Sequence, residues 1–171
     1  MSDATIFIPE REINGMIREF GPDYDADGIQ LFFAVRSLAQ RINDATSRWL
    51  SPFGLSATKY SYLAVLYANR ATGLSPSDIG IAVHTVSGTV SSMIAALERD
   101  GLIERISDEA DRRRATIRLT KKGERVFHRA ALVHHANIRD SLAELQPAEV
   151  RSLLGLLSRL GDGLTAYKTA I

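Results

Sequence analysis

The stretch of residues 85–120 limits the fold of this chain more than any other. Its first part has apolar residues at every third or fourth position, the spacing of one face of an α-helix. Asp100-Gly101 ends that helix, because glycine readily adopts the left-handed conformation that closes a helix. Two short β-prone segments follow, residues 102–107 and 115–119, on either side of a charged turn. The stretch therefore predicts a helix that leads into a two-stranded hairpin.

The predicted helix has two different faces. Its apolar face is formed by Val86, Val90, Met93, Ile94 and Leu97. A rotation of about 100° per residue places small and mostly polar residues on the other side. Thr85 is a candidate N-cap for this helix. Small side chains would let the helix backbone approach a groove closely, and the outward residues are Thr85, Ser87, Gly88, Thr89, Ser91, Ser92 and Ala95.

The charged turn holds Asp108, Glu109, Asp111, Arg112, Arg113 and Arg114. Residues 105–125 contain eight basic and four acidic side chains, whereas the whole chain has a net charge of only +1. Positive charge concentrated in one segment of a nearly neutral protein is typical of a nucleic-acid contact. A basic hairpin that is simply solvated remains the alternative.

Helices are predicted on both sides of this stretch. Apolar periodicity indicates long helices over residues 28–50 and 120–144, and a shorter one that Ser56 would cap. Ser75-Pro76-Ser77-Asp78 has the cap, proline and acidic residue of a helix start. Pro147 opens a last helix, and residues 9–19 are expected to form a short helix in an N-terminal extension. Forty-five per cent hydrophobic residues in a chain of 171 are enough for a core.

Several classes of function are disfavoured by what the sequence lacks. The chain has no cysteine, so disulfides and thiol redox sensing are excluded. The sequence shows neither a signal peptide nor an apolar run of about 20 residues, which predicts a cytoplasmic protein with no membrane partner. It also has no nucleophile elbow and no phosphate-binding glycine loop, so neither an enzyme nor a cofactor is expected.

Here the sequence resembles the MarR family of bacterial transcription regulators. The resemblance is carried by three motifs and by the spacing between them: Leu97-Glu98-Arg99-Asp100-Gly101-Leu102-Ile103-Glu104-Arg105, then Asp111-Arg112-Arg113, then Leu119-Thr120-Lys121-Lys122-Gly123. It implies a mainly α fold, a winged helix-turn-helix with a two-stranded β-hairpin wing and N- and C-terminal dimerisation helices. The implied domains are an N-terminal extension (1–27), a dimerisation region (28–55 and 121–171) and a DNA-binding domain (56–120).

The resemblance also implies partners and roles for individual residues. The partners are double-stranded DNA, a second copy of the chain, and a small aromatic or phenolic effector that releases a repressor from a pseudo-palindromic operator. Arg113 matches the wing arginine of the minor groove, Asp111 the acid that holds it, and Arg112 and Arg114 would reach phosphates. Ser75 is also expected at the DNA. The effector would contact Trp49, Tyr60, Tyr62 and Tyr67, although core packing is the commoner role of such aromatic residues.

One departure and two alternatives accompany this interpretation. The recognition helix has no Arg or Lys before Arg99, so affinity should depend strongly on the wing. One alternative is a helical dimeric protein-interaction module with a winged domain that no longer binds DNA. The other is a metal-responsive regulator using His128 and His135, which lie seven residues apart. No carboxylate stands at ligand spacing to these histidines, so solvated or interface histidines are favoured and no metal site is predicted.

Overall fold

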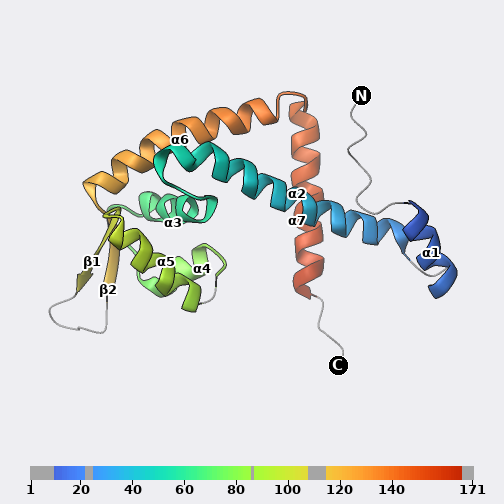
Figure 1. The fold of residues 1–171 in the computed structure, drawn as a ribbon, viewed down its shortest axis with the longest axis horizontal. Helices are drawn as coiled ribbons and strands as arrows, with labels where there is room; N and C mark the ends of the chain where they lie inside the picture. The colour runs from blue at the N-terminus through green and yellow to red at the C-terminus, as the bar shows by residue number, and fades with distance from the viewer. Residues whose placement is uncertain (1–9, 22–24, 86, 108–114, 167–171) are drawn as a thin grey trace. The chain divides into compact units, whose positions relative to one another are not determined.

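The computed structural model describes residues 10–21, 25–85, 87–107 and 115–166 (Figure 1). It divides into two compact units, Met1–Ala130 and Ala131–Ile171. In chain order, the elements are α1 (Glu10–Phe20), α2 (Ala26–Leu50), the short 3-10 helix η1 (Ser51–Phe53), α3 (Ala57–Ala68), α4 (Pro76–Ala82), α5 (Ser87–Arg99), β1 (Ile103–Ser107), β2 (Ala115–Leu119), α6 (Lys121–Ser141) and α7 (Pro147–Ala166). The mainly helical fold with one hairpin is as the sequence predicts.

Side-chain caps set the beginnings of several helices. Asp25 accepts a hydrogen bond from Gly28 N (2.8 Å) at the start of α2, and Ser56 accepts one from Lys59 N (3.2 Å) at the start of α3. Ser75 and Asp78 form the reciprocal capping box predicted for α4. Each cap satisfies backbone N–H groups that the first turn of a helix leaves unpaired. The predicted starts at Ser56 and Ser75 are therefore confirmed.

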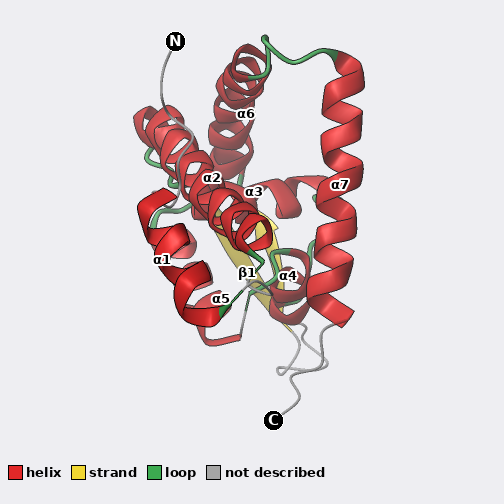
Figure 2. Cartoon of the chain, turned by 90° about the vertical axis from the view of Figure 1, so that its right-hand side faces the viewer, coloured by secondary structure: helices red, strands yellow, loops and turns green. Residues whose placement is uncertain are grey.

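The hairpin is antiparallel and pairs Ile103 with Leu119 and Ser107 with Ala115 at its two ends. The segment before α4 joins it, because Leu74 and Ile117 exchange two backbone hydrogen bonds of 3.1 and 2.8 Å. Figure 2 shows the strands next to α4 and α5. Ile117 and Leu119 are buried, and the residue between them is only half-buried, which confirms the predicted one-sided strand.

The core of the first unit lies between α3, α4, α5 and the hairpin. Leu63, Ile79, Leu97 and Ile117 have no exposed surface, and Ile94 is only 1% exposed. Burying an aliphatic side chain of this size contributes about 1.5–3 kcal/mol. The apolar face predicted for α5 is therefore the face that holds this helix in the domain, and its other face remains available for contacts.

Two predicted helix ends need correction. The expectation that Thr85 caps α5 is wrong, because the helix begins at Ser87 and the Thr85 hydroxyl donates to the Val83 carbonyl (3.1 Å). α6 ends at Ser141 and not at residue 144. A turn separates it from α7, which begins at Pro147, and proline disfavours helical backbone in the residue before it.

The second unit contains the distal part of α6 and all of α7. Both helices expose large apolar side chains, and those of α7 include Leu153, Leu154, Leu156, Leu157 and Leu164. Among the described residues, no single helix has the length and apolarity of a membrane span. Only α4 and α5 taken together pass that test, as a pair bent by 109°.

Candidate nucleic-acid interface

α4 and α5 form a helix-turn-helix. Their axes differ by 109°, within the usual range for this motif. The turn contains His84, the one described residue other than glycine that has a positive φ (52°). Histidine tolerates this left-handed conformation better than most residues do. An open depression of about 520 Å³ lies between the two helices, and Ser77, Ile81 and Ser91 are part of its lining.

The outward face of α5 consists of small side chains, as the sequence predicts. Ser87, Gly88, Thr89, Ser91 and Ser92 are all exposed. The hydroxyls of Ser91 and Ser92 donate to backbone carbonyls one turn earlier, at 3.2 and 2.9 Å. A serine hydroxyl keeps acceptor capacity when it donates, so this face can still meet base edges. Thr85 is only half-buried at the edge of the same surface.

Ser75 lies at the beginning of α4 and is already used in the fold. Its hydroxyl accepts from Asp78 N (3.2 Å) and donates to the Asp78 carboxylate (2.7 Å). A contact between this hydroxyl and DNA would compete with the capping box. The structure therefore gives Ser75 a clear structural role, whatever it contributes to DNA binding.

The base of the wing is attached through β2 to the segment that precedes α4. The Arg118 guanidinium donates to the Thr72 carbonyl through Nε (3.3 Å) and Nη2 (3.0 Å). Gly73 beside it has φ +75°, and a Cβ there would lie 2.5 Å from Thr116 Cγ2. These contacts hold the base of the wing against the segment before α4. The turn that carries Asp111, Arg112, Arg113 and Arg114 lies outside the described residues.

The start of α6 is joined to the end of α5. Gly101 has φ +68°, and Leu102 N donates to Leu97 O (3.0 Å), which completes the left-handed helix stop predicted there. Thr120 then donates through its hydroxyl to Gly101 O (2.8 Å) and accepts from Gly123 N (3.0 Å). The residues 119–123, which carry part of the family resemblance, are thus explained by packing.

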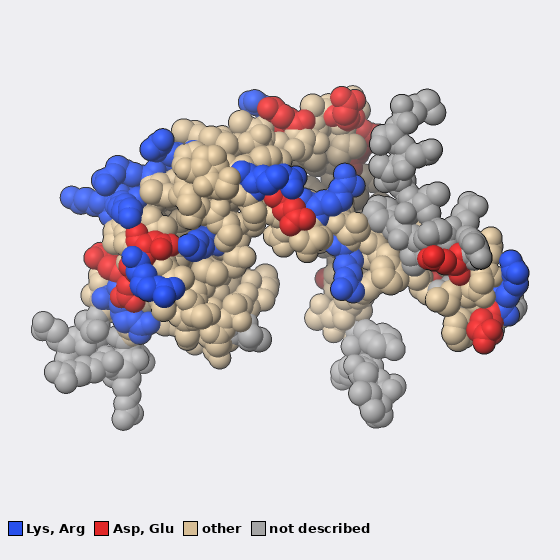
Figure 3. Space-filling model, viewed as in Figure 1, with Lys and Arg blue, Asp and Glu red and all other residues tan. Residues whose placement is uncertain are grey.

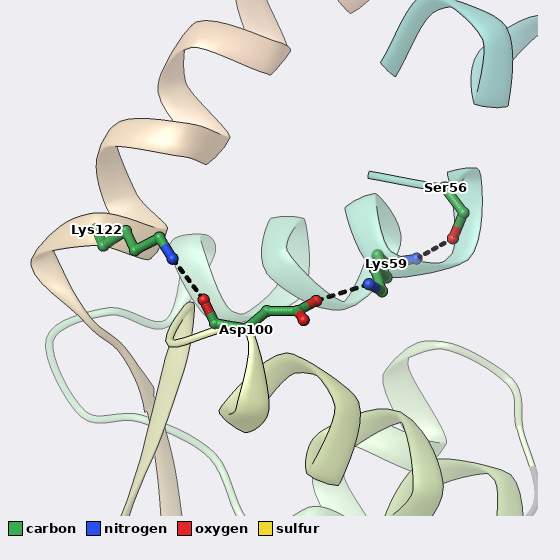
Figure 4. A network of polar contacts seen from close by, with 4 residues as sticks. All are labelled: Ser56, Lys59, Asp100 and Lys122. Carbon is green, nitrogen blue, oxygen red and sulfur yellow. Dashed lines mark hydrogen bonds and ion pairs between the residues drawn. The ribbon is translucent and has the colours of Figure 1, made fainter. Parts of the chain in front are cut away.

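Figure 4 shows a second connection between the same elements. Asp100 forms an ion pair with Lys59 of α3 (2.6 Å), and its carbonyl accepts from Lys122 of α6 (2.6 Å). The hydrogen bond from Lys59 holds the pKa of the Asp100 carboxyl below its usual value, while desolvation acts in the opposite direction. Lys59 and Asp100 thus link α3 to the end of α5.

Positive charge collects at the base of the wing and not on α5. Lys121, Lys122, Arg125 and Arg129 are exposed along the beginning of α6. Figure 3 shows Lys and Arg side chains gathered over this end of the domain, whereas the surface over α4 is almost uncharged. The described residues thus agree with the division predicted from the sequence, in which the helix carries hydroxyls and little charge.

Two of the aromatic residues predicted to contact an effector share one aromatic neighbour. Tyr60 and Tyr67 both contact Phe127 of α6, with ring centroids 5.2 and 4.7 Å apart. Tyr62 lies two positions from Tyr60, on another side of α3, and its hydroxyl is buried without a hydrogen-bond partner of good geometry among the described residues. Burial raises the pKa of Tyr62, and the Thr85 hydroxyl lowers it. Trp49 is half-buried near the end of α2.

The histidines do not gather into a ligand set. Within the part of the chain that the structure describes, no three His, Asp or Glu side chains are placed to hold one metal ion. Burial, and then the charge of His135, lower the pKa of His134.

A helix-turn-helix followed by a two-stranded hairpin defines the class of the domain, the winged helix-turn-helix of DNA-binding proteins. A sequence model described as the MarR family matches residues 55–115. The transcriptional regulator PecS of Dickeya dadantii is 31% identical over 81% of this chain and 84% of its own length. The chain therefore belongs to the MarR family, whose members are DNA-binding transcription regulators and not enzymes.

Solved structures agree with this assignment. The transcriptional repressor CouR bound to a DNA duplex is 27% identical, with a TM-score of 0.68 over 77% of this chain and 92% of CouR. The MepR–DNA complex of S. aureus is 24% identical, has a TM-score of 0.70 and covers 77% of this chain and 94% of that one; it supports the fold alone. Double-stranded DNA is thus the partner that the family and the fold indicate.

Sequence reasoning missed several residues of this region. Lys59 was not singled out, because its partner Asp100 is 41 positions away. Phe127 was also missed. It is one of few large apolar residues at the polar start of α6, and a large apolar residue among polar ones is itself a signal of a buried contact. From the sequence, Arg118 is only one of the basic residues of segment 105–125. In the structure its guanidinium donates to the Thr72 carbonyl and so has a structural role.

Proposed function

We propose that the protein is a homodimeric repressor that binds a pseudo-palindromic operator and leaves it when a small ligand binds. In this proposal, the α5 helices of two copies enter successive major grooves about 34 Å apart. Arg113 of each wing enters the adjacent minor groove, where negative potential is focused. Asp111 orients Arg113, and Arg112 and Arg114 neutralise phosphates.

The observation that carries the proposal is the exposed face of α5. Five adjacent outward positions hold no side chain larger than threonine and no acid, so the backbone can approach base edges without steric or electrostatic repulsion. Hydroxyl groups can contact any base pair, and so they supply limited discrimination. Since the outward face of α5 carries no positive charge, most of the affinity should come from the arginines of the wing and depend strongly on salt.

The dimer is supported by apolar side chains that the single chain leaves exposed. On α2, Leu31, Phe32 and Ile42 are each more than half exposed. On α7, Leu154 is 62% and Leu156 57% exposed. Large apolar surfaces of this kind usually mark an interface. Residues 28–55 and 121–171 are proposed as the dimerisation region, and light scattering of the purified protein tests the expected mass of two chains.

The proposed effector is a small aromatic or phenolic compound. Trp49, Tyr60, Tyr62 and Tyr67 are the proposed contacts, with Tyr60 and Tyr67 acting together because both contact Phe127. Binding would act by favouring a dimer in which the spacing of the two recognition helices no longer fits the operator. CouR, to which this chain is similar, is a transcriptional repressor, and this supports the proposed sign of regulation.

The test is fluorescence anisotropy with the DNA upstream of the protein's own gene. Arg113→Ala should weaken binding several-fold or more and leave the folding transition unchanged. Arg129→Ala removes the same charge from an exposed site on α6 and should have a much smaller effect. Equal affinities of the wild type and Arg113→Ala at moderate salt would refute the role of the wing arginine. Absence of specific binding by the wild type would favour the alternative of a protein-interaction module.

A further inference from the structure

A small cavity lies on the outside of the DNA-binding domain, between the end of α3 and the beginning of α6. Its volume is about 230 Å³, and it is lined by Tyr67, Arg70, Glu124, Arg125 and His128. None of these residues belongs to the recognition helix or to the wing. The cavity is smaller than a typical site for a drug-sized ligand, so only a small molecule would fit.

Arg70 is held in place at the edge of this cavity. Its Nη1 donates to the Tyr67 carbonyl (3.1 Å), and its guanidinium lies 4.7 Å from the centroid of the Tyr67 ring. Tyr67 is itself packed on Phe127. A guanidinium fixed by stacking and by one hydrogen bond keeps other N–H donors for a ligand and loses little entropy when it binds.

Arg125 and His128 line the cavity from α6. No described carboxylate lies within ion-pair distance of Arg70, Arg125 or His128, although Glu124 lines the same cavity. Two arginines against one carboxylate leave an excess of positive charge, and Figure 3 shows that this end of α6 is strongly basic. The charge of the lining therefore favours an anion over a cation.

We propose that this cavity binds a small organic or inorganic anion through a carboxylate or phosphate group held between Arg70 and Arg125. Both groups present paired oxygen atoms, which match the parallel N–H donors of a guanidinium. His128 supplies a further donor, and the Tyr67 ring offers an aromatic wall. Glu124 faces the same space and weakens the binding of every anion there. The proposal shares Tyr67 with the proposed effector contacts and to that extent rests on the proposed function, but its test needs no DNA, so the failure of one can be distinguished from the failure of the other.

The test is titration calorimetry of the full chain at constant ionic strength, with sodium phosphate and sodium benzoate as separate probes. At least one anion should bind saturably in the millimolar range, about the strength expected of one charged contact at an open site. Arg70→Ala and Arg125→Ala should each raise its Kd roughly tenfold. Glu124→Gln should lower it. Phosphate and benzoate differ in their non-ionic part, so the probe that binds identifies the class of ligand.

Controls distinguish binding of an anion in the cavity from attraction to the general positive charge of the surface. Arg129→Ala removes one positive charge one turn along α6, outside the cavity, and should leave the Kd unchanged. Benzamide, which has the shape of benzoate but no charge, should not bind. The proposal is overturned if neither anion binds saturably, or if Arg129→Ala weakens binding as much as Arg125→Ala. It is also overturned if Arg125→Ala changes only the affinity for DNA.

Discussion

Replacement of Gly123 by alanine should separate α6 from the base of the wing. A Cβ at this position would overlap the Leu102 carbonyl oxygen and lie 2.9 Å from the carbonyl carbon. Ordinary contacts of a Cβ begin at about 3.4 Å. The obstacle is backbone and not the end of a flexible side chain, so the first turn of α6 would have to move away.

The size of the effect follows from the contacts in that turn. Alanine stabilises a helix interior by about 1 kcal/mol relative to glycine. Overpacking against a rigid neighbour costs about 1–3 kcal/mol, and the shift would also strain the hydrogen bonds from Thr120 N to Leu102 O (3.1 Å) and from the Thr120 hydroxyl to Gly101 O. Each such bond contributes about 1 kcal/mol. The expected net result is a loss of roughly 1–3 kcal/mol in the free energy of unfolding.

Urea denaturation followed by circular dichroism measures this loss, and operator affinity is measured on the same sample. Gly15→Ala is the matched control, because Gly15 is also helical and a Cβ there would meet no described atom within 4 Å. That control should be neutral or slightly stabilising. If Gly123→Ala is as stable as Gly15→Ala, the close approach of α6 to Leu102 is not a constraint on the fold and the reasoning fails.

Three further substitutions test other contacts. Lys59→Ala should reduce stability by at most about 1 kcal/mol, because the Asp100 side chain is 41% exposed. The pKa of Asp100 is lowered in the fold, so the contribution of the pair is present at neutral pH and is lost as acid titrates the carboxylate; denaturation of both proteins between pH 7 and pH 3 should show the difference disappear. Tyr62→Phe should raise the melting temperature slightly: a buried hydroxyl without a good partner costs about 1–3 kcal/mol, and the interaction with the Thr85 hydroxyl offsets part of this cost. Ser75→Ala should cost about 1 kcal/mol in urea denaturation through loss of the α4 cap, and Ser77→Ala, at an exposed position in the same turn, should not.

Local chemistry made much of the fold predictable from the sequence. The helix starts at Ser56 and Ser75 depend on side chains that bond to their own first turn, so the information is contained in four adjacent residues. The stop at Gly101 depends on one backbone conformation. The outward face of α5 follows from helical periodicity once the apolar face is known. Predictions of this kind do not require knowledge of what a residue contacts elsewhere in the chain.

Contacts between distant segments could not be predicted in the same way. The pair Lys59–Asp100 and the contact between Arg118 and the Thr72 carbonyl join residues more than 40 positions apart. Nothing in the local sequence of either partner distinguishes it from other exposed charges. The end of α6 was placed three residues too late for a related reason: the sequence from 142 to 144 is compatible with helix, and the turn before Pro147 decides where the helix stops.

The base of the wing is held at three separate places: by Leu74 on β2, by Arg118 on the Thr72 carbonyl, and by Thr120 on the end of α5. These contacts join β2 and the residue after it to the segment before α4 and to the end of α5. Moving the base of the wing relative to α4 and α5 would break several hydrogen bonds together, and their contributions of about 1 kcal/mol each would add to a substantial cost. A weakly bound ligand cannot supply that much differential binding energy, since a conformational equilibrium shifts only by the difference in affinity for its two states. In the proposed ligand-released repressor, the ligand should therefore leave the base of the wing and α5 as one rigid body, and act through the spacing of the two DNA-binding domains of the proposed dimer.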